Sequence, residues 1–337
     1  MPLTFPNQTD GFFVISDFRF QSGEALTELR LQYLTLGTPK RDNSGRVVNA
    51  VLMLHGTTST SRHFLKQTVA GELFGEGQPL DATRYFIILP DDIGHGGSSK
   101  PSDGLRSRFP HYGYHDSVTA QFRLVTEHFG IDHLRLLFGY SMGGMQAWLW
   151  AERYPKFMDC LLPLACQPVQ IAGRNLIFRR MITQAIRSDP AWQCGEYRSA
   201  PQAWLPASLI FTIMTDSPVS LQAEAPTRES AEALFDTIAK NAAKTFDAND
   251  LLSWLEASWD YDPEPDLHTI KARVLAVNFA DDMINPPNLG IMERALERVA
   301  DGRYVLIPES DKTKGHQTVF LAAVWKTYVR ELLESIG

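Results

Sequence analysis

The chain has 337 residues, of which 44% are hydrophobic and 21% charged, and its formal net charge at pH 7 is −7. This length allows two domains, or one large α/β domain with an insertion. The acidic balance argues against a general nucleic-acid-binding protein, and three cysteines without CxxC spacing argue against a disulfide framework or a zinc site.

No stretch of eighteen apolar residues is present, so we expect no membrane-spanning helix. The first twenty residues lack a basic segment followed by an apolar one, and therefore do not resemble a signal peptide. We expect a cytoplasmic protein, although a leader removed before residue 1 would leave no trace here.

Strands are expected to alternate with amphipathic helices, an order typical of a mostly parallel sheet. Two strands of partly alternating polarity are predicted at 12–20 and 29–37. The nearly continuous apolar runs that follow indicate strands covered on both faces. These runs lie at 51–55, 85–90, 134–139, 161–165, 273–279 and 303–308. The helical patterns between them lie at 117–129, 141–154, 288–300 and 316–335.

One long interval, residues 168–267, contains no convincing strand run. Proline-containing stretches separate its helical patterns, which lie at 174–187, 203–214, 229–244 and 247–258. We interpret the interval as a helical lid over the C-terminal edge of the sheet. The chain then divides into a first core part (1–167), the lid (168–267) and a second core part (268–337).

The most informative motif is the G-x-S-x-G sequence at 139–143, which stands between an apolar strand and a helical pattern. Alone, the motif is as compatible with a chance turn as with a catalytic one. In this context it predicts a sharp strand-to-helix turn that presents Ser141 as a nucleophile, with small residues on both sides to avoid clashes. The backbone N–H of Met142, at the start of the helix, is expected to stabilise an oxyanion.

A serine hydroxyl needs a base to accept its proton, and the base needs a carboxylate to orient it. In the strand-turn-helix context of this motif the chain order should be Ser, acid, His. Asp281 and Asp282 follow the seventh predicted strand, and His316 follows the eighth. Of the two aspartates we favour Asp282, which stands four residues before the proline pair at 286–287, while Asp281 is expected to cap a turn or be solvated.

The loop after the first continuous apolar run is expected to supply the second oxyanion donor, the backbone N–H of Thr57. His55 precedes it and is expected to be structural, since a base there would compete with His316. In the loop after the next strand, Asp92 and His95 are expected to hold the loop through hydrogen bonds rather than to react.

No metal or cofactor is expected. His111 and His115 have an i,i+4 spacing that could suit a metal, but their segment is loop-like and lacks a third ligand. No dinucleotide-binding fingerprint follows the first apolar strand.

Together these motifs resemble the α/β-hydrolase fold and, more narrowly, the homoserine O-acetyltransferase family. The resemblance rests on Ser-Met-Gly-Gly-Met-Gln-Ala from Ser141, on Asp-Met-Ile-Asn-Pro-Pro from Asp282, and on Gly-His at His316. It extends into the lid at 184–192 and 246–252, and so covers nearly the whole chain. It implies an α/β-hydrolase fold, a Ser141–His316–Asp282 triad, and a dimer formed through lid helices.

Two departures from that family bear on the substrate. The acetyltransferases carry an arginine and a tyrosine seven residues apart on a lid helix, where they are thought to hold the amino-acid substrate. Ser208 and Thr215 occupy the corresponding positions here, and serine cannot replace the charge of a guanidinium. The glycine-rich loop at 94–101 resembles that of ester and C–C hydrolases instead. Homoserine is therefore not expected as the acceptor.

The leading hypothesis is a serine-dependent acyl hydrolase that acts on a small ester through an acyl-enzyme. One alternative is an O-acyltransferase that moves an acetyl group from acetyl-CoA to homoserine or another alcohol. A second alternative is a non-catalytic binding protein with the same fold. Large apolar lid residues suggest a partly apolar acyl pocket, although most are expected in the lid core: Phe178, Ile182, Trp204, Phe211, Met214 and Trp254.

Overall fold

The computed structural model describes residues 4–337, and of residues 242–245 it describes the backbone alone. Its centre is an eight-stranded sheet with the order β1-β2-β4-β3-β5-β6-β7-β8. The strands are β1 (Thr9–Arg19), β2 (Ala25–Leu36), β3 (Ala50–Leu54), β4 (Phe86–Pro90), β5 (Leu134–Tyr140), β6 (Met158–Leu164), β7 (Arg273–Phe279) and β8 (Gly302–Ile307). Each predicted strand is present, with boundaries shifted by at most four residues.

The sheet is parallel except at one end. β2 runs antiparallel to both β1 and β4, and the six strands from β4 to β8 run parallel. Every residue of β3 and β4 is buried, which explains why these runs are apolar at all positions. Because parallel strands end at the same edge, the loops that follow β3, β4, β5, β7 and β8 meet there.

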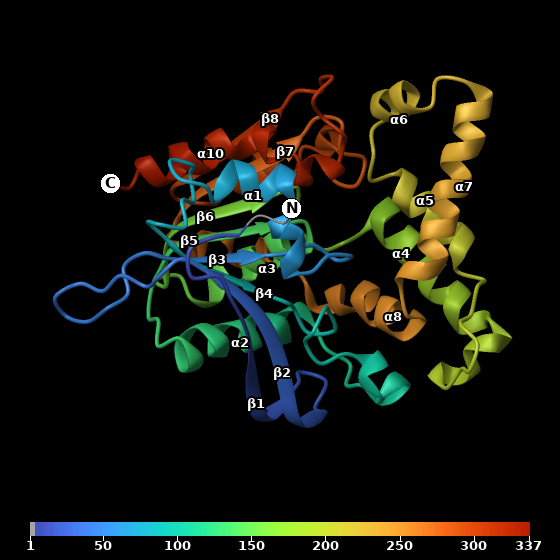
Figure 1. The fold of residues 1–337 in the computed structure, drawn as a ribbon, viewed down its shortest axis with the longest axis horizontal. Coiled ribbons are helices and arrows are strands. Elements are labelled where there is room, and N and C mark those ends of the chain that lie inside the picture. The colour runs from blue at the N-terminus through green and yellow to red at the C-terminus, as the bar shows by residue number, and fades with distance from the viewer. Residues whose placement is uncertain (1–3) are drawn as a thin grey trace.

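Helices cover both faces of the sheet (Figure 1). One apolar core lies between the sheet and α1 (Gln67–Leu73) and α10 (Ala322–Glu334). The other lies between the sheet and α2 (Tyr114–Arg123), α3 (Met142–Arg153) and α9 (Ile291–Leu296).

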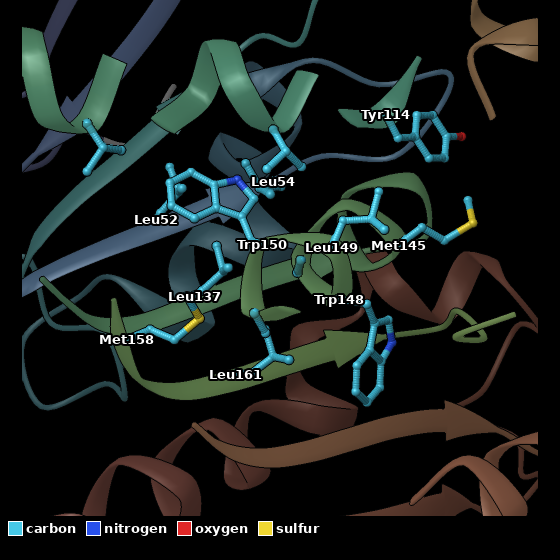
Figure 2. Packing of buried hydrophobic residues seen from close by; sticks show 14 of the residues in the cluster. Leu52, Leu54, Tyr114, Leu137, Met145, Trp148, Leu149, Trp150, Met158 and Leu161 are labelled. Carbon is cyan, nitrogen blue, oxygen red and sulfur yellow. The ribbon is translucent and has the colours of Figure 1, made fainter. Parts of the chain in front are cut away.

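The packing of α3 fixes the helix that begins next to Ser141. Figure 2 shows Trp148 and Trp150 of α3 among apolar side chains from the strands, and both tryptophans are fully buried. The indole nitrogen of Trp150 also donates to the side chain of Gln121 on α2, 2.8 Å away. The start of α3 is therefore held by tight packing of buried side chains.

Between β6 and β7, residues 168–267 form helices and no strand. We call residues 168–267 the inserted segment; its helices are α4 (Gly173–Ser188), α5 (Leu205–Ile213), α6 (Pro218–Glu224), α7 (Arg228–Thr245) and α8 (Ala248–Glu256). They stand beside the edge where the parallel strands end (Figure 1). A small core of their own includes Ile182, Ile186, Trp204, Leu251 and Trp254.

Two local features differ from the expectation. No helical pattern was predicted between 214 and 229, but Pro218 begins α6 there, and Ser217 caps that helix by accepting from the Ser220 N–H at 3.1 Å. Proline is tolerated at the first helical position because no N–H is needed there. The last helical pattern, expected from residue 316, instead opens with a 3-10 turn before α10 begins at Ala322.

None of the helices in the described range is long and apolar enough to cross a bilayer.

Candidate active site

Ser141 lies in a tight turn between β5 and α3. Its backbone has φ 53° and ψ −118°, a conformation that residues other than glycine rarely adopt. A Cβ atom on Gly139 would lie 2.1 Å from the carbonyl oxygen of Gly143, and one on Gly143 would lie 2.2 Å from that of Leu54. Larger residues would not fit at either position, so the motif forms the strained strand-to-helix turn that its context predicts.

Three side chains predicted from separate loops lie in hydrogen-bond contact at the strand edge. The Ser141 hydroxyl lies 2.9 Å from Nε2 of His316, and Nδ1 of His316 lies 2.8 Å from Oδ2 of Asp282. A carboxylate accepts, so Nδ1 carries the proton and Nε2 is free to accept the proton of the serine. This arrangement can activate a serine for attack on a carbonyl group.

Asp282 is held ionised by its surroundings. Its Oδ1 accepts from the backbone N–H groups of Ile284 (2.8 Å) and Asn285 (3.1 Å), and its Oδ2 accepts from the Asn285 amide at 3.1 Å. Burial raises the pKa of Asp282, but the charge and hydrogen bond of His316, together with the bonds from Asn285, hold that pKa below its ordinary value. Sequence reasoning did not single out Asn285, although an Asn three residues after an Asp in a tight loop is a usable signal.

Asp281 has a different contact. Its Oδ2 accepts from the backbone N–H of Gly315 at 2.9 Å, which ties the loop after β7 to the loop that carries His316. The structure thus places Asp282, the aspartate favoured from the sequence, in contact with His316. Asp281 was expected to cap a turn or be solvated, but it is buried and connects two loops.

The two predicted oxyanion donors come from residues near Ser141. Met142 is the first residue of α3, where an N–H has no partner within its own helix, and Thr57 lies in the cavity wall beside Ser141. In the described chain neither N–H donates to another protein group. Met142 is buried, and its side chain does not belong to the cavity wall.

The loop that carries Thr57 is held by two buried histidines. His95 lies with Nε2 2.7 Å from the Thr57 carbonyl oxygen and Nδ1 2.9 Å from that of Ile93. His55 accepts from the backbone N–H of Asp92 at 3.0 Å, and its other ring nitrogen lies 2.9 Å from the Gly56 carbonyl oxygen. Both histidines thus contact backbone groups and not the reacting serine.

Asp92 is fully buried in a polar network. It accepts from the side chains of Ser117 (3.0 Å), Gln146 (2.7 Å) and Gln121 (3.2 Å). Burial raises the pKa of Asp92. These bonds connect the loop after β4 to helices α2 and α3.

The serine and histidine open into a cavity of about 1020 Å³ between the strand edge and the inserted segment. Apolar side chains form much of its wall, including Met145, Phe211, Val219, Leu289 and Phe320. Of the large lid residues noted in the sequence, Phe211 lines this cavity, whereas Ile182, Trp204 and Trp254 belong to the core of the inserted segment.

The two positions that differ from the acetyltransferases have separate surroundings. Thr215 lines the cavity, and its hydroxyl accepts from the side chain of Gln317 at 2.7 Å. Ser208 does not line it, and its hydroxyl donates to the Leu205 carbonyl oxygen at 2.8 Å. Neither residue presents a positive charge to the cavity.

Within the described residues no group of three His, Cys, Asp or Glu side chains could hold a metal ion. The His111 ring packs against Trp259, with ring centres 5.6 Å apart.

A family model described as the alpha/beta hydrolase fold matches residues 49–310. The chain belongs to the α/β-hydrolase family. A homoserine O-acetyltransferase from Haemophilus influenzae is 30% identical over 79% of this chain and 81% of its own length. An ethyl acetate hydrolase from Pseudomonas veronii is 33% identical over 55% of this chain and 52% of its own. The structure of the acetyl esterase MekB matches with a TM-score of 0.82 and 25% identity over 97% of both chains.

These matches confirm the α/β-hydrolase fold and the similarity to homoserine O-acetyltransferases that the motifs indicated. The chain is an enzyme of this family, whose relatives include both ester hydrolases and O-acetyltransferases. The matches to named enzymes favour catalysis over the alternative of a non-catalytic binding protein.

Proposed function

We propose that this enzyme hydrolyses small esters through an acyl-enzyme on Ser141. The observation that carries the proposal is the continuous hydrogen-bonded chain from Ser141 through His316 to Asp282, which opens into a ligand-sized cavity.

In the first half of the proposed reaction, Oγ of Ser141 attacks the ester carbonyl carbon while Nε2 of His316 takes the hydroxyl proton. The N–H groups of Thr57 and Met142 stabilise the negative oxygen of the tetrahedral intermediate. The bond to the alcohol oxygen then breaks, and His316 gives its proton to the departing alcohol. Asp282 stabilises the imidazolium throughout.

In the second half, His316 takes a proton from water, and the resulting hydroxide attacks the acyl group on Ser141. The bond from the acyl carbon to Oγ breaks, and His316 returns the proton to the serine. The products are the free acid and the alcohol, and the enzyme is regenerated.

The acceptor that resolves the acyl-enzyme separates hydrolysis from acyl transfer. At positions 208 and 215 the chain lacks the arginine and tyrosine that are thought to hold the amino-acid substrate in the acetyltransferases, which supports water over homoserine. Similarity to an ethyl acetate hydrolase and an acetyl esterase points the same way, whereas similarity to a homoserine O-acetyltransferase supports transfer from acetyl-CoA.

The Ser141→Ala variant tests the nucleophile. With p-nitrophenyl acetate, the wild type should release p-nitrophenol at a rate at least about 10⁴-fold above that of the variant, because the variant lacks the hydroxyl that the proposed mechanism acylates. A fluorophosphonate probe should label the wild type and not the variant. Turnover of the variant at the wild-type rate would contradict the mechanism, and an unlabelled wild type would support the non-catalytic alternative.

The acceptor is tested with acetyl-CoA and homoserine. Thiol release should not rise when homoserine is added. Homoserine-dependent release faster than ester hydrolysis would instead assign the acyltransferase function.

We also propose that the inserted segment (168–267) acts as a lid on a core made of 1–167 and 268–337, and that it forms the face of a homodimer. Exposed apolar side chains on α4 and α5 support this face: Leu176, Ile177, Met181, Ile210 and Ile213. A cytoplasmic location stays a prediction.

A further inference from the structure

A buried arginine lies in the wall of the catalytic cavity. Arg179, on α4, is only 4% exposed, yet it borders the same cavity as Ser141 and His316. The mechanism proposed above gives it no role.

The hydrogen bonding of Arg179 is incomplete. Its Nε donates to the Asn175 side chain at 3.0 Å, and its Nη1 donates to the Leu255 carbonyl oxygen at the long distance of 3.4 Å. Both acceptors are neutral, and Arg179 takes part in none of the ion pairs of the described residues, whereas Arg187 on the same helix pairs with Glu256. A guanidinium has five N–H donors, and burying its charge without an anion is costly.

A buried tyrosine lies beside it. Burial raises the pKa of Tyr114, while the charge of Arg179 and a side-chain hydrogen bond from Arg179 oppose that rise. Among the described residues the Tyr114 hydroxyl has no other hydrogen-bond partner. In Figure 2 the side chains of Tyr114 and Met145 extend in the same direction, and Met145 belongs to the cavity wall. Tyr114 itself is not part of the cavity wall, and its neutral hydroxyl does not supply the anion that the Arg179 guanidinium lacks.

We propose that Arg179 is a carboxylate-binding subsite of the catalytic cavity, and that the esters cleaved at Ser141 carry a carboxylate in addition to the ester group. A guanidinium binds a carboxylate through two parallel N–H donors, which would supply the anion that Arg179 lacks. The subsite lies on α4, apart from Ser208 on α5 and from Thr215, which follows α5. The inference rests on the proposed ester hydrolysis and adds a substrate class to it.

Arg179 also borders a second cavity, and an anion bound there is the alternative to a carboxylate bound in the catalytic cavity. It has a volume of about 750 Å³, and its wall includes Arg180 and Arg187. An anion bound there would not be part of the ester. A carboxylate in the catalytic cavity must compete with a neutral ester, whereas one in the second cavity need not, so the mode of inhibition separates the two.

The first measurement compares matched esters on the wild type. For a carboxylate on the acyl part, the mono-p-nitrophenyl ester of glutaric acid is compared with that of glutaramic acid. For a carboxylate on the alcohol part, acetyl-lactate is compared with acetyl-lactamide, with acetate release as the readout. We expect kcat/KM to favour the anionic ester of one pair by about tenfold or more, and that pair identifies the part that carries the carboxylate.

The second measurement uses three variants. Arg179→Gln should lower kcat/KM for the anionic ester by about tenfold more than for its neutral partner, and so abolish the preference. Arg179→Lys keeps the charge and should keep part of the preference. Arg180→Gln, which removes the exposed neighbouring arginine on the same helix, should behave as the wild type.

A binding measurement keeps the subsite testable without turnover. Calorimetry should detect glutarate binding to the Ser141→Ala protein and lose it when Arg179→Gln is added. With the wild type, glutarate should inhibit neutral-ester hydrolysis competitively.

Equal kcat/KM within both ester pairs, non-competitive inhibition, or glutarate binding that survives Arg179→Gln would overturn the subsite. If no ester is hydrolysed but glutarate still binds through Arg179, the proposed function fails and the subsite stands.

Discussion

His55 illustrates how burial sets the role of a histidine near this active site. Both of its ring nitrogens contact backbone groups, and burial, assisted by the charge of His95, lowers its pKa from 6.5 to about 3. A neutral ring is required, because its Nε2 accepts from an N–H. His55 therefore supports the loop that carries Thr57 in one protonation state only.

This pKa predicts a pH dependence of stability. Between pH 6.5 and about 3 the unfolded chain takes up a proton at this position and the folded chain does not, so the free energy of unfolding falls as the pH falls through that range. From pH 7 to 4.5 this contribution amounts to about 2–3 kcal/mol.

Urea denaturation at pH 7 and 4.5 checks it. His55→Gln should lose less stability between the two pH values than the wild type, whereas His268→Gln, at an exposed position, should match the wild type. Equal losses in the wild type and His55→Gln would show that His55 is protonated in the folded state.

At the scale of elements, the turn between β5 and α3 depends on close backbone approach. The space at Gly143 is closed by the carbonyl groups of Leu54 and His55 at the end of β3, whereas a Cβ on Gly75 would make only ordinary contact with Gln78 at 3.7 Å. An alanine substitution should therefore be costly at Gly143 and tolerated at Gly75.

Gly143→Ala should lower the free energy of unfolding by about 2 kcal/mol or more and remove ester hydrolysis, because β3 and α3 must move apart. Gly75→Ala should change the free energy of unfolding by no more than about 0.5 kcal/mol. Thermal unfolding and p-nitrophenyl acetate turnover measure both effects. A Gly143→Ala protein with wild-type stability and activity would mean that the turn has room to relax.

The sequence predicts an element well when the signal for it comes from neighbouring residues. The buried strands and the Ser141 turn were predictable, because apolar runs and flanking glycines are local signals. The start of α6 at Pro218 was not, since the same proline signals a break or a first helical turn. Arg179 was not predicted either, because its place in the cavity wall arises from contacts with distant parts of the chain, such as its bond to the Leu255 carbonyl oxygen.

For the whole molecule, the inserted segment is tied to the core close to the reacting groups. The Gln317 backbone N–H, one residue after His316, donates to the Thr215 carbonyl oxygen at 2.9 Å. On the other side, Trp254 of α8 donates to the Gly94 carbonyl oxygen at 2.6 Å and stacks on His95, with ring centres 4.7 Å apart. A shift of the inserted segment would therefore displace both His316 and the loop that carries Thr57.

The exposed apolar face of α4 predicts self-association. Ile177 is 60% exposed on this face, and Val48, at 51%, is a comparable residue outside the inserted segment. Light scattering after gel filtration should show a dimer for the wild type and for Val48→Glu, and a monomer for Ile177→Glu, because a charge in an apolar interface costs its desolvation. A wild-type monomer, or an Ile177→Glu dimer, would exclude this face.

Ser141 should carry the acyl group during ester hydrolysis. Rapid acid quenching of the enzyme with p-nitrophenyl acetate, followed by peptide mass spectrometry, detects that intermediate. We predict one acetyl group on the peptide that contains Ser141, formed within the burst of p-nitrophenol release, and none on that peptide in Ser141→Ala. An acetyl group on another residue, or full hydrolysis by Ser141→Ala, would show that Ser141 is not the nucleophile.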